Sequence, residues 1–375
     1  MAGLVEAMHR TIAGAWMSGM PEQPLINGTA DVAYSAVRAI TALVGRGIDA
    51  IVAPLVPLLG EIPSSPEREA VLAALNGIMG DHLEATHNPL AIRMRLRRFG
   101  KPLRLERQYL AAAIPRRSGK LLVLVHGLSM NDLQWTRNGH NHGAALAGEL
   151  GWTPVHLHYN SGLHVSTNGR AFAGLIETLV EQWPSRVREL AILAHSSGGL
   201  VSRSAFHYAT LAGHRWPGHL RKLIFLGTPH HGSAIERGGN WVNVLLSLSP
   251  YSAPLARVAK IRSAGITDLR YGSLLDEDWE GADRFHHSGD ARHPVPLPEG
   301  VRCFTIAASN GKILGDGLVS LNSALGRHSD PRLTLCFAKS HQWIGHGMHH
   351  WDLLSHPSVH SRIRKWIGSH GQPRA

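Results

Sequence analysis

From residue 121 onward, short apolar runs alternate with segments of helical periodicity. The runs that predict strands are 121–127, 153–159, 189–195, 220–227, 301–308 and 332–338. The helical patterns lie near 168–183, 198–212 and 357–367. Strands that alternate with helices predict an α/β fold, in which helices flank both faces of a mostly parallel sheet.

The segment before this alternation predicts a hairpin. Between residues 90 and 98, arginines alternate with apolar side chains, which is typical of an edge strand with its arginines on the solvent face. The arginines are Arg93, Arg95 and Arg97. The Gly100-Lys101 pair predicts a turn, and we expect the second strand near 103–105.

The first ninety residues carry helical patterns instead. Apolar positions recur at helical spacing from about residue 31 to residue 54, and the run from Ser64 to Glu67 is typical of a helix start. We therefore predict a helical extension over 1–89 and one α/β domain over 90–370. Within that domain, the stretch of about 232–298 is too long for a simple loop, so we expect a cap over the site.

Composition limits the class of protein. A chain of 375 residues with 43% hydrophobic residues can bury a large core. The two cysteines, Cys303 and Cys336, lie in apolar runs and predict buried free thiols in a reducing compartment, so we expect a cytoplasmic protein. Charged residues interrupt the N-terminus and the apolar stretch after residue 35, so we predict neither a signal peptide nor a transmembrane helix.

The net charge of +11 favours acidic partners in general. The basic residues are mostly scattered arginines without a nucleic-acid-binding motif, so we expect no nucleic-acid partner. Peripheral contact with an anionic membrane stays open.

The stretch LAILAHSSGGLVSRSA, residues 190–205, joins an apolar strand to a helical pattern through two serines and two glycines. A serine on such a turn matches the nucleophile elbow G-x-S-x-G. The residues two before and two after the nucleophile must be small, because they approach the neighbouring strand and helix. Centring the motif on Ser196 places an alanine and a glycine there, whereas centring it on Ser197 places His195 there. Ser196 is the predicted nucleophile, with an ordinary helix N-cap as the alternative.

A serine nucleophile needs oxyanion donors, a base, and an acid that orients the base, all from loops at the carboxyl ends of the strands. The backbone amides of Leu128 and Ser197 are the candidate oxyanion donors. Asp316 lies between two glycines after the strand 301–308 and is the candidate acid, with an ordinary Asp-Gly turn as the alternative.

Several histidines are available as the base. The segment SHQWIGHGMHHWDLLSHP contains His341, His346, His349 and His350. A metal cluster is an alternative interpretation, but no carboxylate or cysteine completes a recognisable ligand spacing, so we predict no metal site. Position alone leaves His346, His349 and His350 open as bases, and His350 precedes apolar residues that can hold its loop.

Five motifs resemble the lipase and esterase branch of the α/β-hydrolase superfamily, in particular bacterial GPI inositol-deacylase-like lipases. They are VHGLSMND, AHSSGGLV, LGTPHHGS, GDGLVS and HHWDLLSHPSVHSRIRKWI. The resemblance covers roughly residues 90–370 and implies the α/β-hydrolase fold with the motif order Ser, Asp, His. Its H-x-D-L-L context implies His350 as the base. Ala194 departs from the glycine that usually opens the elbow motif.

Together, the residues and the resemblance predict a serine hydrolase of carboxylic esters, either an esterase or a lipase. We expect a small-molecule or lipid ester as substrate, with Ser196, His350 and Asp316 as the triad and without a metal or organic cofactor. Thioesterase, amidase and acyltransferase activities share this triad, and a non-catalytic binding protein of the same fold is a further alternative. The intact triad argues against the binding protein.

Overall fold

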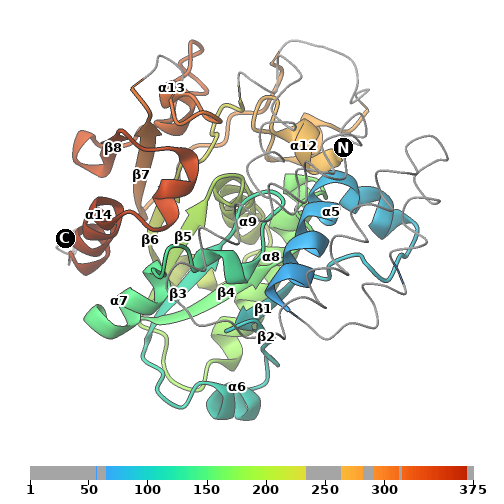
Figure 1. Ribbon diagram of the computed structural model, residues 1–375, viewed down its shortest axis with the longest axis vertical. Coiled ribbons are helices and arrows are strands. Elements are labelled where there is room, and N and C mark those ends of the chain that lie inside the picture. Colours follow the sequence, from blue (N-terminus) through green and yellow to red (C-terminus); the bar gives the residue numbers. More distant parts are fainter. Residues whose placement is uncertain (1–55, 57–64, 234–262, 282–289, 312–314, 370–375) are drawn as a thin grey trace, which may run out of the picture.

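The computed structural model describes residues 56, 65–233, 263–281, 290–311 and 315–369. A central eight-stranded sheet, in the order β2-β1-β4-β3-β5-β6-β7-β8, runs through the described chain (Figure 1). The strands from β4 to β8 in this order are parallel, whereas β1 is antiparallel to both of its neighbours. The predicted α/β-hydrolase fold is confirmed.

The elements follow the predicted alternation. The strands are β1 (Arg95–Arg98), β2 (Lys101–Pro102), β3 (Lys120–Val125), β4 (Thr153–His158), β5 (Glu189–His195), β6 (Leu220–Leu226), β7 (Arg302–Ser309) and β8 (Gln342–His346). The α-helices are α5 (Pro66–Ala85), α6 (Arg107–Ala113), α7 (His142–Leu150), α8 (Val165–Gln182), α9 (Gly198–Leu211), α12 (Ala264–Asp268), α13 (Leu321–Ala324) and α14 (Pro357–Gly368). Two short 3₁₀ helices matter for the site, η1 (Asp132–Trp135) and η6 (His350–Leu354).

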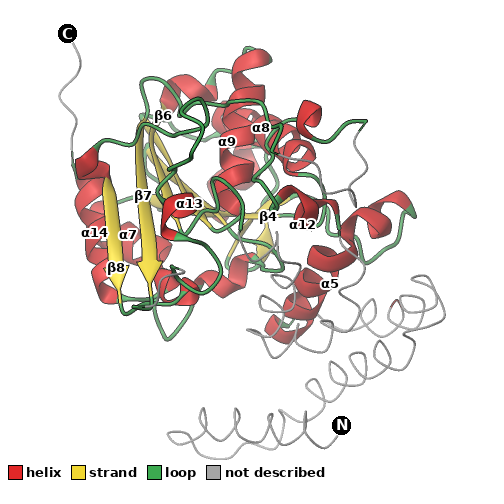
Figure 2. Cartoon of the chain, turned by 90° about the horizontal axis from the view of Figure 1, so that it is seen from above, coloured by secondary structure: helices red, strands yellow, loops and turns green. Residues whose placement is uncertain are grey.

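Helices cover both faces of the sheet, so most residues of its central parallel strands are apolar and buried. Successive residues of β3 alternate between two cores: Leu121 and Val123 pack with residues of α5, α8 and α9, whereas Leu122 and Leu124 pack with residues of α7 and α14. Figure 2 shows α7 and α14 on one side of the strands and α8 and α9 on the other.

Helix α5 begins where the sequence predicts. The Ser65 side chain accepts a hydrogen bond from Arg68 N at 3.2 Å, and a proline occupies the first turn. Val71 and Leu75 are fully buried in the core that the sheet shares with α8 and α9. The domain division at residue 89 stays a prediction, because the rest of the expected extension lies outside the described residues.

The predicted strand at 332–338 is wrong. Leu335 and Phe337 are buried and Cys336 between them is exposed, so the segment has the burial alternation of a strand. It does not pair with the sheet, because β8 occupies the free edge of β7, where Ala307 pairs with Ile344. The expectation of a buried thiol is therefore wrong for Cys336 and confirmed for Cys303.

The hairpin is tighter than the sequence predicts. Arg98 pairs directly with Lys101, so the turn is Phe99-Gly100, with φ angles of 51° and 74°, and β2 ends at Pro102 before the expected strand at 103–105.

One arginine of this hairpin lies inside the protein. Arg97 is 5% exposed, which corrects the expectation that it faces solvent. Its Nη1 lies 2.6 Å from Glu69 Oε2 of α5 and 3.1 Å from Asp132 Oδ1 of η1. The side chain is buried because α5 and η1 cover this face of β1 with acidic partners.

None of the described helices combines the length and the apolar character that crossing a bilayer requires. Cytoplasmic location and peripheral membrane contact stay predictions.

Candidate active site

Ser196 occupies a strained turn between β5 and α9. Its φ angle is +53°, in the left-handed region that non-glycine residues seldom adopt, and its backbone N donates to Leu226 O of β6 at 2.8 Å. Such a conformation costs about 1–2 kcal/mol and persists only where the surrounding structure imposes it. The side chain is 3% exposed. The geometry is that of a nucleophile elbow.

Two glycines allow this turn to approach β3. A Cβ atom on Gly198 would lie 2.5 Å from His126 O and 2.6 Å from Val125 O, which are backbone atoms. A Cβ atom on Gly127 would lie 2.8 Å from the Cβ of Ser196. The elbow therefore sits against the end of β3, and this contact explains why the residue two after Ser196 has no side chain.

The predicted acid and one of the candidate bases meet in the structure. His350 Nδ1 lies 2.6 Å from Asp316 Oδ2, and both side chains are almost fully buried. The other carboxylate oxygen, Oδ1, accepts from Leu318 N at 2.9 Å and Val319 N at 2.8 Å. Because the carboxylate accepts, the His350 ring carries its hydrogen on Nδ1 and presents a lone pair at Nε2. Within the described chain, this Nε2 is buried and has no hydrogen-bond partner.

The His350 ring is held from two sides. Gly227, at the end of β6, has a φ angle of +58°, and a Cβ atom there would lie 2.9 Å from His350 Cε1. The ring centroid of His195, the residue before Ser196, lies 4.7 Å from that of His350. The candidate base therefore packs directly against the strand that carries the elbow.

The other candidate histidines lie away from Asp316. His346 ends β8 and His349 precedes η6, and both are exposed. His341 Nδ1 contacts the backbone oxygen of Cys303 at 3.1 Å. Over the described residues, these three and His350 form no group of metal ligands.

The two predicted oxyanion donors adjoin residues of the elbow: Ser197 follows Ser196 in sequence, and Leu128 follows Gly127, where an added Cβ atom would lie 2.8 Å from Ser196 Cβ. In the described part of the chain, neither the Leu128 N–H nor the Ser197 N–H has a hydrogen-bond partner. The peptide between Gly127 and Leu128 is oriented by His126, whose Nδ1 lies 2.8 Å from Gly127 O. In a trans peptide the N–H points away from the carbonyl, so Leu128 N–H faces away from the His126 ring. The roles of both amides as oxyanion donors stay predictions.

Sequence reasoning missed the two rings that support this loop. Tyr159 stacks on His126 with centroids 4.4 Å apart, and its hydroxyl donates to His126 O at 2.8 Å. Burial lowers the pKa of His126 to about 4, so the ring is neutral at pH 7. The VHG motif contains the histidine, but no local pattern links it to a tyrosine that follows β4.

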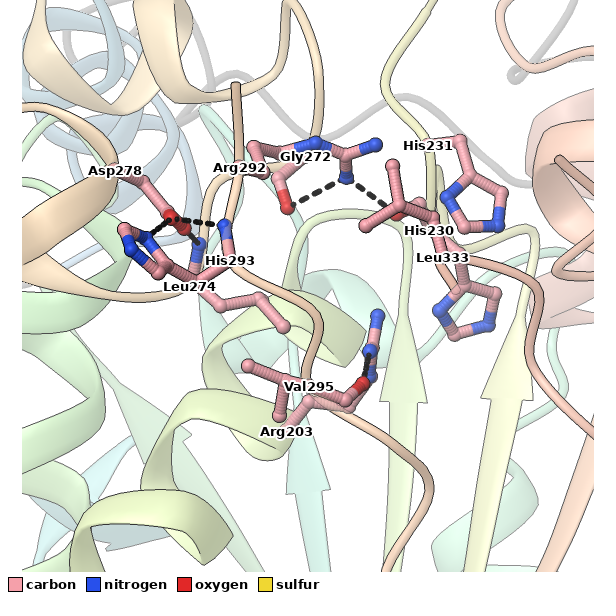
Figure 3. A pocket seen from close by; sticks show the side chains of 10 residues that line it. All are labelled: Arg203, His230, His231, Gly272, Leu274, Asp278, Arg292, His293, Val295 and Leu333. Atoms are coloured by element: carbon pink, nitrogen blue, oxygen red, sulfur yellow. Dashed lines mark hydrogen bonds and ion pairs between the residues drawn. The ribbon is translucent and has the colours of Figure 1, made fainter. Parts of the chain in front are cut away.

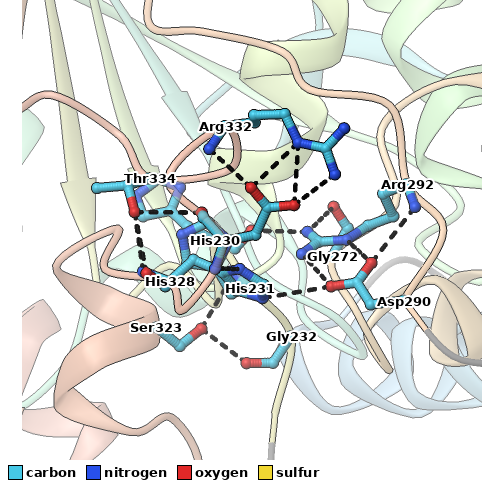
Figure 4. Close-up of polar contacts among 11 residues, drawn as sticks. His230, His231, Gly232, Gly272, Asp290, Arg292, Ser323, His328, Arg332 and Thr334 are labelled. Carbon is cyan, nitrogen blue, oxygen red and sulfur yellow. Dashed lines mark hydrogen bonds and ion pairs between the residues drawn. The ribbon is translucent and has the colours of Figure 1, made fainter.

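Polar contacts hold the loop after β6 (Figure 4). Arg292 Nη1 donates to His230 O at 3.2 Å, and Arg292 also pairs with Asp290 at 2.8 Å. Ser323 of α13 donates to Gly232 O at 2.7 Å. These contacts fix parts of the expected cap, residues 232–298, whose segments 234–262 and 282–289 lie outside the described residues. The role of the cap stays a prediction.

A small polar cavity lies beside this loop (Figure 3). Its volume of about 10 Å³ suits a single water and is far below the size of a substrate pocket. Arg203, His230, His231 and Arg292 are among its lining residues. Burial lowers the pKa of His231 to about 4 and that of His230 well below its ordinary value, so both rings are neutral.

One protein-family model matches part of this chain. The family model of the PGAP1-like alpha/beta domain matches residues 170–309, which include Ser196. No curated protein matches the sequence significantly.

Solved structures of lipases resemble the chain more loosely. The mature lipase BlEst2 of Bacillus licheniformis is 19% identical, with a TM-score of 0.44 over 74% of this chain and 98% of that one. Lipase B of Aspergillus fumigatus is 14% identical, with a TM-score of 0.46 over 92% of this chain and 85% of that one. The sheet and the family model together carry the assignment: this chain has the α/β-hydrolase fold, and its residues 170–309 match the PGAP1-like alpha/beta domain, as the resemblance implied.

Proposed function

We propose that this chain is a serine hydrolase that cleaves carboxylic esters, with Ser196 as nucleophile, His350 as base and Asp316 as the acid that orients the base. The observation that carries the proposal is the buried pair of His350 and Asp316, 2.6 Å apart, next to a serine held at a φ angle of +53°. The three residues follow β5, β7 and β8, which are parallel, so all three lie at the same edge of the sheet.

The arrangement supports the following chemistry. As Ser196 Oγ attacks the acyl carbon, its proton passes to His350 Nε2, and the N–H groups of Leu128 and Ser197 donate to the oxyanion. Asp316 stabilises the imidazolium through Nδ1. The tetrahedral intermediate then expels the alcohol, which takes the proton from Nε2. A water molecule, deprotonated by the same nitrogen, hydrolyses the acyl-enzyme and regenerates Ser196.

One adjustment precedes this reaction. His350 Nε2 has no hydrogen-bond partner among the described residues, so the hydrogen bond to Ser196 Oγ that the reaction requires is not formed. Rotation of the serine about χ1 reorients Oγ toward His350 without moving the backbone. Catalytic hydrogen bonds often shorten only when substrate binds.

The experiment that tests this proposal combines covalent labelling with turnover. A fluorophosphonate probe should label the purified chain at Ser196, identified by mass spectrometry of the adduct. The chain should also hydrolyse p-nitrophenyl esters. Activity restricted to short acyl chains identifies an esterase, and activity that rises with chain length and at an interface identifies a lipase. Absence of both labelling and turnover in the folded chain contradicts the proposal.

A further inference from the structure

Three histidines converge between α7 and α14, outside the candidate active site. His142 begins α7, His140 lies two residues before it, and His360 lies in the first turn of α14. The two helices contact each other on one side of the sheet (Figures 1 and 2). Across the described residues, these three side chains are the set of possible metal ligands whose donor atoms all lie within 4.8 Å of one another. His142 is fully buried, and the other two are half-buried.

Hydrogen-bond acceptors outside the cluster determine which ring nitrogen of His142 and of His360 carries the hydrogen. His142 Nε2 lies 3.0 Å from Leu353 O, and His360 Nε2 lies 3.1 Å from Glu149 Oε1. Both partners are acceptors, so both Nε2 atoms carry a hydrogen, and in the neutral rings each Nδ1 has a free lone pair. Burial lowers the pKa of His142 to about 3, which keeps that ring neutral at pH 7.

The inward nitrogens of His142 and His360 lie at the spacing of two ligands around one ion, and that of His140 lies close to them. His142 Nδ1 is 3.3 Å from His360 Nδ1 and 2.9 Å from His140 Nε2. His140 can donate one hydrogen to His142, but this leaves the lone pairs of His142 and His360 facing each other. Two nitrogens bound to Zn²⁺ at about 2.0–2.1 Å with tetrahedral geometry are about 3.3–3.4 Å apart. A cation shared by His142 and His360 therefore relieves this repulsion at their present separation.

We propose that His142 Nδ1, His360 Nδ1 and His140 Nε2 form a zinc site. Ligating histidines usually donate their other N–H to a backbone carbonyl or a carboxylate, and Leu353 O and Glu149 supply these two acceptors here. Three imidazoles are a typical ligand set for Zn²⁺. A concavity of about 650 Å³, lined by residues that include His140, His360 and Glu149, leaves room for water as the fourth ligand.

The site is structural, and it does not depend on the proposed hydrolase activity. It joins the loop before α7 to α14 and, through the carbonyl of Leu353, to η6. A second contact supports the same junction, because Asn138 Nδ2 donates to Ser355 Oγ at 3.2 Å. Zinc should therefore stabilise the segment that carries His350 without touching the reacting atoms.

Zinc binding by the full chain tests this proposal. The chain, without an affinity tag and stripped with EDTA, is titrated with ZnCl₂ by isothermal titration calorimetry. We expect one tight site, weakened at least 100-fold in His360→Ala and in His140→Ala. Glu149→Ala, which removes the acceptor of His360 Nε2 together with the ion pair to Arg364, should weaken binding about 10- to 100-fold. His346→Gln, an exposed histidine on β8, should bind zinc like the wild type.

The melting temperature gives a second readout. Zinc should raise the Tm of the wild type and of His346→Gln but not that of His360→Ala. The proposal is overturned if the wild type binds no zinc, or if binding survives both histidine substitutions and therefore occurs elsewhere among the 26 histidines. If a histidine variant does not fold, the affinity of Glu149→Ala for zinc is the deciding measurement, and an unchanged affinity in that variant also overturns the proposal.

Discussion

The two adjacent serines of the elbow differ in their backbone conformation. Ser196 has a φ angle of +53°, whereas Ser197 adopts right-handed helical angles, φ −57° and ψ −22°, as the N-cap of α9. Only Ser196 is in the strained position that directs a nucleophile away from its helix. We therefore expect Ser196→Ala to lose at least about a thousandfold in ester turnover, and Ser197→Ala to keep most of its activity because only its amide is used.

Turnover of a p-nitrophenyl ester and labelling by a fluorophosphonate probe measure this difference. Circular dichroism serves as the control for folding of both variants. If Ser197→Ala is the inactive variant and Ser196→Ala is not, the register of the elbow is wrong.

The base gives a second prediction at the scale of single residues. His350 is the histidine that contacts Asp316, whereas His349 and His346 are exposed. His350→Gln should lose about as much activity as Ser196→Ala, because members of a triad act as a unit. Asp316→Asn should also lose about a thousandfold or more, since the amide favours the wrong ring tautomer.

His349→Gln and His346→Gln are the matched controls for this series and should stay within a few-fold of wild type. The measurement is kcat on the same ester, with folding checked for each variant. Wild-type turnover in folded His350→Gln would show that another group is the base.

At the scale of elements, the elbow depends on close contact between α9 and β3. A Cβ atom at Gly198 would meet two backbone oxygens at the end of that strand at 2.5 and 2.6 Å, and neither can move without moving the strand. Gly198→Ala should therefore lower the free energy of unfolding by about 1–3 kcal/mol, the typical penalty of overpacking, and should reduce turnover.

Gly174→Ala is the matched control. This glycine lies on the exposed face of α8, and a Cβ atom added there would have no described atom within 4 Å, so alanine should stabilise the helix by roughly 0.5–1 kcal/mol. Urea unfolding of both variants measures the contrast. Equal stability of the two would mean that the elbow and β3 are less tightly packed than the structure indicates.

The apolar pattern of the sequence predicts a strand correctly where the segment with that pattern also pairs with a neighbouring strand of the sheet. The strands ending before Ser196 and Asp316 lie where the apolar runs predict them, as β5 and β7. The run 332–338 has the same alternation, but β8 takes its place beside β7. The alternation of apolar and polar residues indicates which side chains are buried. It does not indicate which segment pairs with the edge of the sheet, because that pairing depends on contacts between residues distant in sequence.

The same limit applies to side chains across the whole molecule. Ser196, Asp316 and His350 follow separate strands, and motif order suffices to nominate them. The histidine cluster brings together His142 and His360, which are 218 positions apart and follow no motif spacing. It can be recognised only from the packing of α7 against α14.

The stability of the whole molecule should depend on pH through Asp132. Burial raises the pKa of its carboxyl to about 6 from an ordinary value of 3.8, and Arg97 opposes this effect only in part. Arg97 Nη1, 3.1 Å from Asp132 Oδ1, also pairs with Glu69, and the negative charge of Glu69 raises the pKa of Asp132 further. Because the folded pKa is the higher one, the folded state holds the proton more tightly. The stability that this carboxyl contributes is present below about pH 4 and is lost as the pH rises through 6.

Asp132→Asn removes this titration and keeps the shape of the side chain. The free energy of unfolding of the wild type, minus that of the variant, should fall by roughly 2–2.5 kcal/mol between pH 4 and pH 7, since each unit of pKa shift corresponds to about 1.4 kcal/mol and the unfolded carboxyl is already partly ionised at pH 4. Chemical unfolding at a series of pH values measures the difference. A difference that is constant across this range would show that Asp132 does not titrate there.

The hairpin at the start of the sheet also bears on self-association. Its outer strand, β2, consists of Lys101 and Pro102, both exposed. A proline has no N–H to donate to an incoming strand. An incoming strand would also remove water from the charged lysine side chain, which is unfavourable. On this side the sheet therefore offers no template for edge-to-edge aggregation, and the protein is protected there from polymerising through continuous β-structure.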